Sequence, residues 1–390
     1  MHLKIKKMRI GIEAQRLQRS HKHGMDRVAL ELIKNLQEID KENEYFIFVK
    51  SDEDTKAISN TSNFTVVEIP GGSYPYWEQY KLPKMVEKYN CDILHCTSNT
   101  GPIFSKTPMI TTLHDIIFLQ ENMMKLVTSS ASSYQKFGNL YRRFIVANVV
   151  KSSRRIITVS NYEKQNINAH FTINGPKITA IHNGVSSQFL LNFDSIHSNK
   201  VKTKYNLPDS YVFHIANKDP RKNTKRVLKG FQQFLKSTIG TSYKLVMLGY
   251  KEADLKVLLN EIDASEIYED ILLMGYVSDE DLPEFYRLAQ VFLFPSLKEG
   301  FGIPIIEAMA CGVPVITSNI SAMPEVAGDA AHIIDPYNVD EISNGILKIL
   351  SDSQYKTELI VKGKKRYQMF SWKSMAMSVL EEYQQLFNEQ

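Results

Sequence analysis

The feature that most constrains the fold of this chain is a regular alternation of short β-rich runs with stretches of helical periodicity. In the first half, MRIGIEA (8–14), CDILHCT (91–97) and RIITVS (155–160) are separated by segments whose apolar residues recur every three or four positions. The second half repeats the pattern, with YVFHIAN (211–217) and VFLFPS (291–296) among its strands. Strands that alternate with helices form parallel sheets covered on both faces. The sequence therefore predicts an α/β protein with doubly wound sheets.

The length of the chain indicates two domains. A chain of 390 residues exceeds what a single hydrophobic core usually holds. We place an N-terminal domain at 1–190 and a C-terminal domain at 207–371, with a polar and weakly patterned linker at 191–206. Ligands of doubly wound sheets bind where the carboxyl ends of the strands meet. A cleft between two such domains would therefore be lined by loops that follow strands.

Charge is unevenly distributed along the chain. Residues 1–205 contain 28 Lys and Arg against 18 Asp and Glu, a net charge of +10, and the remainder contains 19 against 25, a net charge of −6. A basic first half indicates an anionic surface or substrate, although solvated lysines would give the same count. Three cysteines and no secretory pattern lead us to expect a cytoplasmic protein. No apolar run approaches the ~18 residues that span a bilayer.

The most informative stretch is FPSLKEGFGIPIIEAMACGVPVI, residues 294–316. It follows a strand pattern at 291–294, and a helix is predicted to begin near Ile303 with a proline in its first turn, where a missing N–H breaks no intrahelical hydrogen bond. The start of such a helix offers the backbone N–H groups of Gly302, Ile303 and Ile305 to an anion or a hydroxyl-rich ligand. This loop is therefore a candidate binding site.

The Glu-x7-Glu pattern of Glu299 and Glu307, within EGFGIPIIEAMACGVPV, resembles the retaining GT-B glycosyltransferases of family GT4. The similarity is clear over 205–345 and weaker before it. The resemblance implies two Rossmann-like domains that face each other across a cleft, with the last helix, 372–390, packing back on the N-terminal domain. It also implies that the C-terminal domain binds a nucleotide-sugar donor and that the N-terminal domain lies on the acceptor side.

The resemblance also assigns roles to matching positions of the donor site. Glu307 would accept hydrogen bonds from the ribose hydroxyls, and Glu299 would contact the donor sugar. A carboxylate only accepts hydrogen bonds and therefore suits paired hydroxyls. Beside these two carboxylates, the implied donor site includes Phe301, Gly302 and Ile303, and a pair expected to flank the base, Tyr276 and Val277.

Cations and a histidine complete the implied catalytic group. The family often has Gly-Arg after the first strand of the C-terminal domain, where this chain has Ala216 and Asn217. We therefore expect Arg221 and Lys222, in the PRKN turn that follows, to stabilise the departing diphosphate. His114, directly after the strand of MITTLHD, matches the histidine that lies near the donor sugar and its phosphate in this family.

The loop HKHGMDRVAL, residues 21–30, departs from the family pattern. The family usually has Gly-x-Gly-Arg here, whereas this chain has Asp26 in place of the second glycine. Because a carboxylate would repel a diphosphate, we expect Asp26 to accept hydrogen bonds from sugar hydroxyls; Asp26 as a cap of its own helix is the alternative. Gly24 and Asp26 are both counted with the donor-binding residues. His21 and His23 form a weak H-x-H pattern, and since no third ligand is evident we expect no zinc there.

Other patterns look like metal sites but are interpreted differently. The Asp-Glu-Asp triplets at 52–54 and 279–281 are interpreted as a surface turn and the start of a helix. In CDILHC, Cys91 and His95 share a strand face but lie about 13 Å apart at ~3.3 Å per residue, and Cys96 points to the opposite face. We interpret all three as core residues and expect no metal.

These features together predict an enzyme. We expect it to retain the anomeric configuration while it transfers a sugar, without metal or cofactor, from a UDP- or GDP-sugar to a hydroxyl. The acceptor would be a glycan or a lipid-linked saccharide in surface polysaccharide synthesis, and nucleic acid is not expected. A non-catalytic subunit that binds nucleotide or glycan, and a nucleotide-sugar epimerase of the same fold, are the alternatives. The aromatic and basic helix 134–152 indicates either a peripheral contact with the inner face of the membrane or a helix buried on one side.

Overall fold

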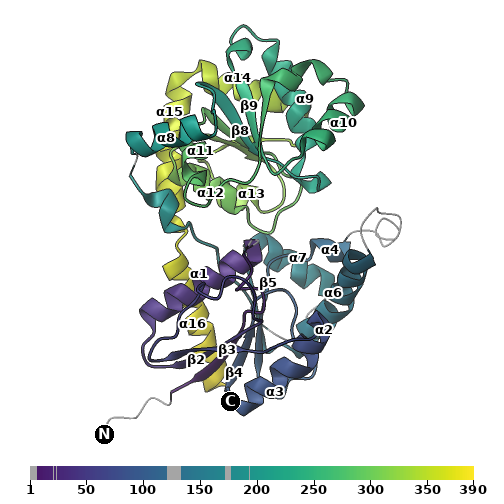
Figure 1. Cartoon of the computed structure of the whole chain (residues 1–390), viewed down its shortest axis with the longest axis vertical. Coiled ribbons are helices and arrows are strands. Elements are labelled where there is room, and N and C mark those ends of the chain that lie inside the picture. The colour runs from purple at the N-terminus through teal and green to yellow at the C-terminus, as the bar shows by residue number, and fades with distance from the viewer. Residues whose placement is uncertain (1–6, 21, 23, 121–132, 172–176, 193) are drawn as a thin grey trace. The chain divides into compact units, whose positions relative to one another are not determined.

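The chain folds into two compact units (Figure 1). This computed structural model describes residues 7–20, 22, 24–120, 133–171, 177–192 and 194–390. The first unit comprises Met1–Gly184 together with Trp372–Gln390, and the second comprises Val185–Ser371. Among the described residues each unit contains one sheet, and every strand pair in the two sheets is parallel. The predicted α/β fold with doubly wound sheets is confirmed.

The first sheet has seven strands in the order β3-β2-β1-β4-β5-β6-β7. Its strands are β1 (Arg9–Glu13), β2 (Glu44–Val49), β3 (Phe64–Glu68), β4 (Ile93–Cys96), β5 (Met109–Leu113), β6 (Arg155–Thr158) and β7 (Lys177–Ala180). Central strands such as β5 are buried at every position, as expected where helices cover both faces of a parallel sheet. The polar loops that follow β1, β4 and β5 therefore emerge at one edge of this sheet.

The helices of the first unit form two layers. They are α1 (Gly24–Ile39), α2 (Tyr74–Tyr76), η1 (Trp77–Lys81), α3 (Leu82–Lys88), α4 (Ile117–Gln120), α6 (Ser133–Ser152), α7 (Asn161–Phe171) and α16 (Trp372–Asn388). Trp77, Val86 and Val149 pack with alternate side chains of β2 and β4 on one face. Figure 1 shows α1 and α16 side by side, and the two helices contact each other. They cover the other face of the sheet.

Polar contacts fix α16 to the first sheet. Arg155 Nη1 of β6 lies 2.7 Å from Glu382 Oε2, and both side chains are more than nine-tenths buried. Thr179 Oγ1 donates to the second carboxylate oxygen of Glu382 at 2.8 Å. The Tyr383 hydroxyl lies 2.6 Å from His95 Nδ1. A helix far from this unit in sequence is therefore held by specific hydrogen bonds as well as by apolar burial.

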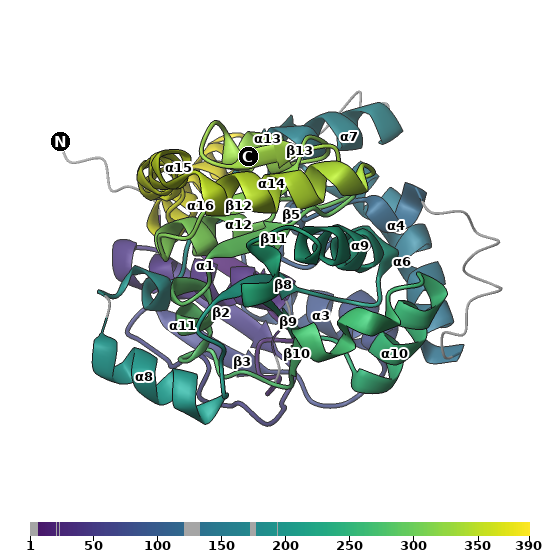
Figure 2. The ribbon, with the colours of Figure 1, turned by 90° about the horizontal axis from the view of Figure 1, so that it is seen from above.

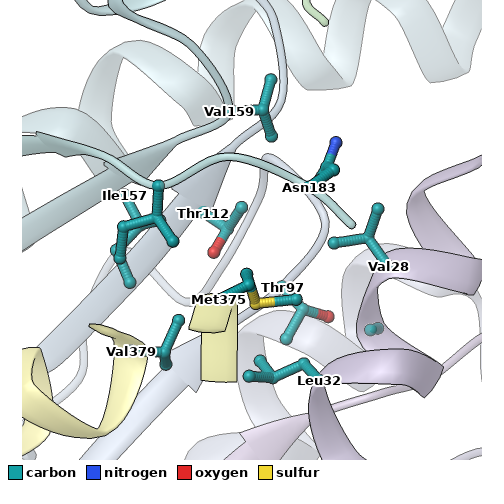
Figure 3. A pocket seen from close by; sticks show the side chains of 11 residues that line it. Val28, Leu32, Thr97, Thr112, Ile157, Val159, Asn183, Met375 and Val379 are labelled. Atoms are coloured by element: carbon teal, nitrogen blue, oxygen red, sulfur yellow. The ribbon is translucent and has the colours of Figure 1, made fainter. Parts of the chain in front are cut away.

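The packing of α1 and α16 leaves a small cavity against the sheet (Figure 3). Its walls are mainly apolar, from Leu32 of α1, Met375 and Val379 of α16 and the strands, with the hydroxyls of Thr97 and Thr112 among them. The cavity volume of about 20 Å³ suffices for one water molecule but not for a sugar ring. We therefore do not assign a substrate to it.

The second sheet has six strands in the order β10-β9-β8-β11-β12-β13. Its strands are β8 (Tyr211–Ile215), β9 (Lys244–Leu248), β10 (Ile271–Met274), β11 (Val291–Phe294), β12 (Val315–Ser318) and β13 (His332–Ile334). Because β8 and β11 are adjacent at the centre, the loops that follow them lie side by side at the carboxyl edge.

Helices surround this sheet as well. The α-helices are α8 (Ser195–Lys204), α9 (Thr224–Leu235), α10 (Glu252–Glu261), α11 (Leu282–Arg287), α12 (Ile303–Ala310), α13 (Met323–Ala327), α14 (Val339–Ser351) and α15 (Ser353–Arg366). The 3-10 helices are η2 (Ser187–Leu190), η3 (Pro220–Lys222), η4 (Gly240–Ser242), η5 (Ser265–Asp270) and η6 (Tyr367–Met369). Figure 2 shows α9 and α14 side by side, and their apolar faces share one core with the sheet.

The stretch 191–206, predicted to link the two domains, contains a helix. Residues Ser195–Lys204 form α8, and the Asp194 carboxylate caps it by accepting from the Ile196 N–H at 2.9 Å. Only Val201 contributes a buried apolar side chain, while Ser198 is buried through its hydroxyl. The hydrophobic periodicity is weak because one of the two buried contacts of this helix is polar.

The segment 134–152 lies within α6. Ile145, Val146, Val149 and Val150 are buried along one face of this helix, as the interpretation of a helix buried on one side requires. None of the helices within the described part of the chain is both long and apolar enough to cross a bilayer.

The buried pair that holds α16 gives a stability prediction. Glu382→Gln should lower the free energy of unfolding of the first unit by about 3 kcal/mol, because the Arg155 charge is left buried with less compensation. Urea titration, monitored through hydrogen exchange of the β6 and α16 amides, would measure this change in the free energy of unfolding. Glu252→Gln, which breaks the exposed pair with Lys256, should leave stability nearly unchanged because solvent screens that pair. Equal effects of the two substitutions would contradict this role of Glu382.

Candidate active site

In the second unit, the loops after β8, β11 and β13 are joined by one side chain. Asn223 adopts a left-handed conformation, with φ of 59°, between η3 and α9. Asparagine tolerates this conformation better than most residues. Its buried Nδ2 donates to the carbonyls of Pro295 at 3.0 Å and Pro336 at 2.7 Å. These two hydrogen bonds fix the positions of the three loops relative to one another.

Lys222 and Glu299 meet at this edge as an ion pair. Lys222 Nζ lies 2.7 Å from Glu299 Oε1, and both side chains are largely but not wholly shielded from solvent. The Glu299 N–H donates to Ser321 Oγ at 3.0 Å, and the Ser321 hydroxyl donates to the Glu299 carbonyl at 2.8 Å. The Leu297 N–H donates to the Arg221 carbonyl at 2.7 Å. The two charged side chains thus extend from loops that are themselves hydrogen-bonded together.

Helix α12 begins at Ile303, as predicted. Gly302 precedes it with φ of 101°, where a β-carbon would lie 3.2 Å from Ile305 Cδ1, so glycine is needed at this turn. The expectation that Ile305 offers its N–H to a ligand was wrong, because that group donates to the Gly302 carbonyl at 3.0 Å. By helix geometry the N–H groups of Gly302 and Ile303 have no intrahelical acceptor.

Glu307 lies inside α12 and is 9% exposed. Tyr286 of α11 donates its hydroxyl hydrogen to Glu307 Oε2 at 3.0 Å. The carboxylate of Glu299 thus contacts Lys222, and that of Glu307 contacts the Tyr286 hydroxyl.

Arg221 is held differently from its neighbour Lys222. Its Nε donates to Asp219 Oδ2 at 2.9 Å, and the Asp219 carboxylate also accepts the Arg221 backbone N–H at 3.0 Å. Burial alone would raise the pKa of Asp219, but the hydrogen bonds from Arg221 outweigh it and lower that pKa. Arg221 therefore stabilises the η3 turn that carries Lys222.

The residues expected to flank the base follow β10. Tyr276 is 74% exposed and Val277 is partly buried. Phe301 is buried and packs edge-on against Phe370, with ring centroids 5.6 Å apart. All of the residues predicted for the donor site after residue 207 therefore lie in the second unit.

His114 lies in the first unit, directly after β5. Its backbone N–H donates to Asn99 Oδ1 at 2.6 Å, and its Nε2 lies 2.8 Å from the Thr97 carbonyl. Because a carbonyl only accepts, the ring proton is on Nε2 and Nδ1 is an acceptor. Burial lowers the pKa of His114, although the Thr97 carbonyl opposes this effect. The imidazole is therefore neutral near pH 7.

Gly24 and Asp26 begin α1. Gly24 is exposed, whereas Asp26 is buried in the first turn. The Asp26 charge acts on both Arg16 and His114, which places its carboxylate near these two groups. His21 and His23, considered for zinc, lie outside the described residues.

Glu13 was not among the residues predicted from the sequence. It ends β1, its Oε1 accepts the Gln15 N–H at 2.9 Å, and burial raises its pKa to about 7, with the nearby Glu78 adding to the shift. Asn223 and Tyr286 were not predicted either. The sequence PRKN could have indicated Asn223, because asparagine favours a left-handed turn. Glu13 and Tyr286 belong to no spaced motif, so no signal in the sequence marked either.

The patterns interpreted as core residues are found in the core. His95 bonds Tyr383 and Thr112 within the first sheet, and Cys91 and Cys96 are buried. Asp281 pairs with Lys204 at 2.7 Å rather than with other acidic residues. Among the described residues no group of three His, Cys, Asp or Glu side chains is placed to hold a metal ion.

Relatives of this chain are found by sequence. It is 34% identical over 236 residues to O-antigen chain mannosyltransferase B of Escherichia coli, a match that covers 60% of this chain and 61% of that protein. It is 28% identical over 253 residues to the serotype-specific mannosyltransferase WbdA of Escherichia coli, which covers 63% of this chain and 31% of WbdA. The chain thus spans less than two thirds of the length of these relatives.

Solved structures agree on the fold. HepE of Anabaena, in complex with UDP-glucose, superposes with a TM-score of 0.74 at 16% identity, over 97% of this chain and 100% of that one. The model for Glycosyltransferase Family 4 matches residues 23–189, and the model for Glycosyl transferases group 1 matches residues 195–366. The two matches cover both units and the stretch that carries Glu299 and Glu307. This chain therefore belongs to the group 1 glycosyltransferases and has the GT-B fold.

Proposed function

We propose that this chain transfers a hexosyl group from a nucleoside diphosphate sugar to a hydroxyl of a glycan or lipid-linked saccharide, with retention of configuration and without a metal. The observation that carries the proposal is the placement of Lys222, Glu299 and the start of α12 at one edge of the second sheet. Because both relatives compared above are named mannosyltransferases, mannose is the first sugar to test. HepE binds UDP-glucose, so UDP stands beside GDP as the candidate carrier.

We assign donor binding to the second unit. Lys222 has three N–H donors and uses one for Glu299, so two can still reach phosphate oxygens. The N–H groups of Gly302 and Ile303, at the positive end of α12, favour a negative group as well. The Glu307 carboxylate would accept hydrogen bonds from the ribose hydroxyls, and Tyr276 and Val277 would flank the base.

The chemistry follows from where charge develops. As the bond between sugar and phosphate breaks, negative charge grows on the diphosphate, and Lys222 stabilises it in place. We propose that the leaving phosphate accepts the proton of the attacking hydroxyl, so that no protein nucleophile is required. Glu299, held by Lys222 and Ser321, would orient the sugar through its hydroxyls rather than attack it.

In the first unit, we propose that His114 and Asp26 bind sugar hydroxyls. His114 is neutral and presents Nδ1 as an acceptor, while its Nε2–H is engaged by the Thr97 carbonyl. A neutral imidazole accepts from a hydroxyl without adding charge beside a phosphate. The basic character of residues 1–205 supports an acceptor that carries negative charge.

We also propose a peripheral contact between the first unit and an anionic membrane surface. Tyr76 and Tyr80 are about half exposed and stacked, with ring centroids 5.2 Å apart, and Lys84 Nζ lies 4.1 Å from the Tyr80 ring centroid. Phe144 of α6 is 66% exposed. Helix α6 contacts η1, because Gln79 Nε2 donates a hydrogen bond to the Tyr141 hydroxyl at 3.0 Å. Exposed aromatics flanked by lysines suit a lipid headgroup layer.

The donor can be identified by calorimetric titration with GDP-mannose, UDP-glucose, ADP-glucose and dTDP-glucose. We expect micromolar binding of one nucleotide class, and Glu307→Ala should weaken it at least about tenfold because ribose hydroxyls lose their acceptor. Transfer assays with and without EDTA would then test the metal-independent reaction. No binding across the set, or binding without turnover on any glycan, would overturn the proposed activity in favour of a non-catalytic binding protein.

Lys222→Met should separate diphosphate from monophosphate recognition. We expect affinity for GDP or UDP to fall about tenfold or more and affinity for GMP or UMP to change little, because the lost charge faces the diphosphate. Lys225→Met is the matched control, since Lys225 pairs with Glu261 at the surface of α9. A uniform loss for both kinds of nucleotide, or an equal loss in the control, would contradict this role of Lys222.

Membrane contact can be measured by cosedimentation with vesicles. The chain should bind phosphatidylglycerol vesicles better than phosphatidylcholine vesicles, and the double substitution Lys84→Glu with Phe144→Ser should reduce that binding several-fold without changing donor affinity. Val257→Ser, which removes an exposed apolar side chain of the second unit, serves as the control. If the double variant binds anionic vesicles as well as the parent chain does, this surface is not the contact.

A further inference from the structure

Tyr286 contacts the carboxylate of Glu307. It lies on α11, is fully buried, and its hydroxyl donates a hydrogen bond to Glu307 Oε2 at 3.0 Å. A carboxylate has about four acceptor sites on its two oxygens. The hydrogen bond from Tyr286 occupies one of these sites and restrains the orientation of the group.

The Tyr286 ring cannot move away from this position. It packs edge-on against three aromatic rings, with centroid distances of 5.8 Å to Phe189, 5.1 Å to Phe213 and 5.0 Å to Phe292. These contacts come from η2, β8 and β11, so the ring is enclosed from three elements. A phenol held this way presents its hydroxyl in one direction.

Helix α11 is itself anchored by buried charge. Glu284 and Arg287 form an ion pair one turn apart, and both side chains are more than nine-tenths buried. The Ser198 hydroxyl of α8 donates to Glu284, and Arg287 Nη2 donates to the Leu191 carbonyl at 2.8 Å. The stretch between Leu191 and Lys204 therefore supports the helix that carries Tyr286. The position of the Tyr286 hydroxyl is determined by elements on both sides of α11.

We propose that Tyr286 is a positioning residue that orients Glu307 to accept hydrogen bonds from the ribose hydroxyls of the bound nucleotide. This inference rests on the proposed donor site. Two adjacent ribose hydroxyls require a carboxylate in one fixed orientation, and the side chain of glutamate has several rotatable bonds. The hydrogen bond to Tyr286 restricts those rotations before the ligand arrives, so less order is lost on binding.

The test compares Tyr286→Phe with the parent chain by titration with GDP and UDP and with their 2′,3′-dideoxy analogues. In the tighter-binding series, the substitution should weaken the ribonucleotide about five- to tenfold. It should weaken the dideoxy analogue by less than about twofold, because that analogue has no hydroxyls for Glu307 to accept from. With the matching nucleotide-sugar, the loss should appear mainly in KM.

Tyr211→Phe is the matched control. Tyr211 is also fully buried in this core and donates its hydroxyl to the Phe285 carbonyl at 2.8 Å, with no contact to Glu307. Its loss should lower thermal stability without altering the preference for ribose hydroxyls. If Tyr286→Phe lowers only stability, as this control does, Tyr286 is a core residue and the inference is overturned.

Glu307→Gln separates failure of the inference from failure of the proposed function. If Glu307→Gln reduces the preference for the ribonucleotide and Tyr286→Phe does not, the donor site stands and the positioning role is wrong. If the parent chain binds nucleotide without any preference for the ribose hydroxyls, Glu307 does not contact them and the inference is overturned with that part of the proposal.

Discussion

The second unit depends on the side-chain amide of Asn223. This residue ends the η3 turn that carries Lys222 and begins α9, and its left-handed conformation directs the amide toward two carbonyls that follow other strands. Each of those buried carbonyls would otherwise lack a partner, at a cost of about 1–3 kcal/mol. The Asn223 amide therefore provides hydrogen bonds to both carbonyls and also fixes the distance between the loops that carry them. The Lys222–Glu299 pair is close because the loops beneath it are tied together.

Polar side chains satisfy the loop backbone beside the candidate site residues of both units. A parallel sheet brings the ends of its strands to one edge, where backbone groups must find partners outside the sheet. Ser321 meets this need for Glu299, Asp219 does so for Arg221, and Asn99 does so for His114. The polar side chains that satisfy the loops are thus the ones that orient the candidate catalytic residues within each unit.

Charged side chains of this protein differ in their exposure to solvent. In the first unit Glu78 and Glu13 are both buried: Glu78 accepts hydrogen bonds from Tyr74, Gln79, Tyr141 and Thr100, and Glu13 Oε1 accepts the Gln15 N–H. Burial holds the pKa of Glu13 above its usual range, at about 7, and the nearby Glu78 charge adds to the shift. In the second unit the pair Lys222 and Glu299 stays partly exposed, where a soluble anion can compete for the lysine.

The alternation of strand and helix patterns determined the α/β fold, since burial on both faces of a sheet leaves runs of apolar residues that are visible in sequence. The glycine-rich stretch with Pro304 located the start of α12, because proline and glycine restrict the backbone locally. Only the tertiary structure showed that residues Ser195–Lys204 form a helix, that Ile305 donates to Gly302, and that Tyr286 bonds Glu307. Those contacts join residues through long-range packing and hydrogen bonds, and a single sequence records which side chains can form such bonds but not which partners come within reach.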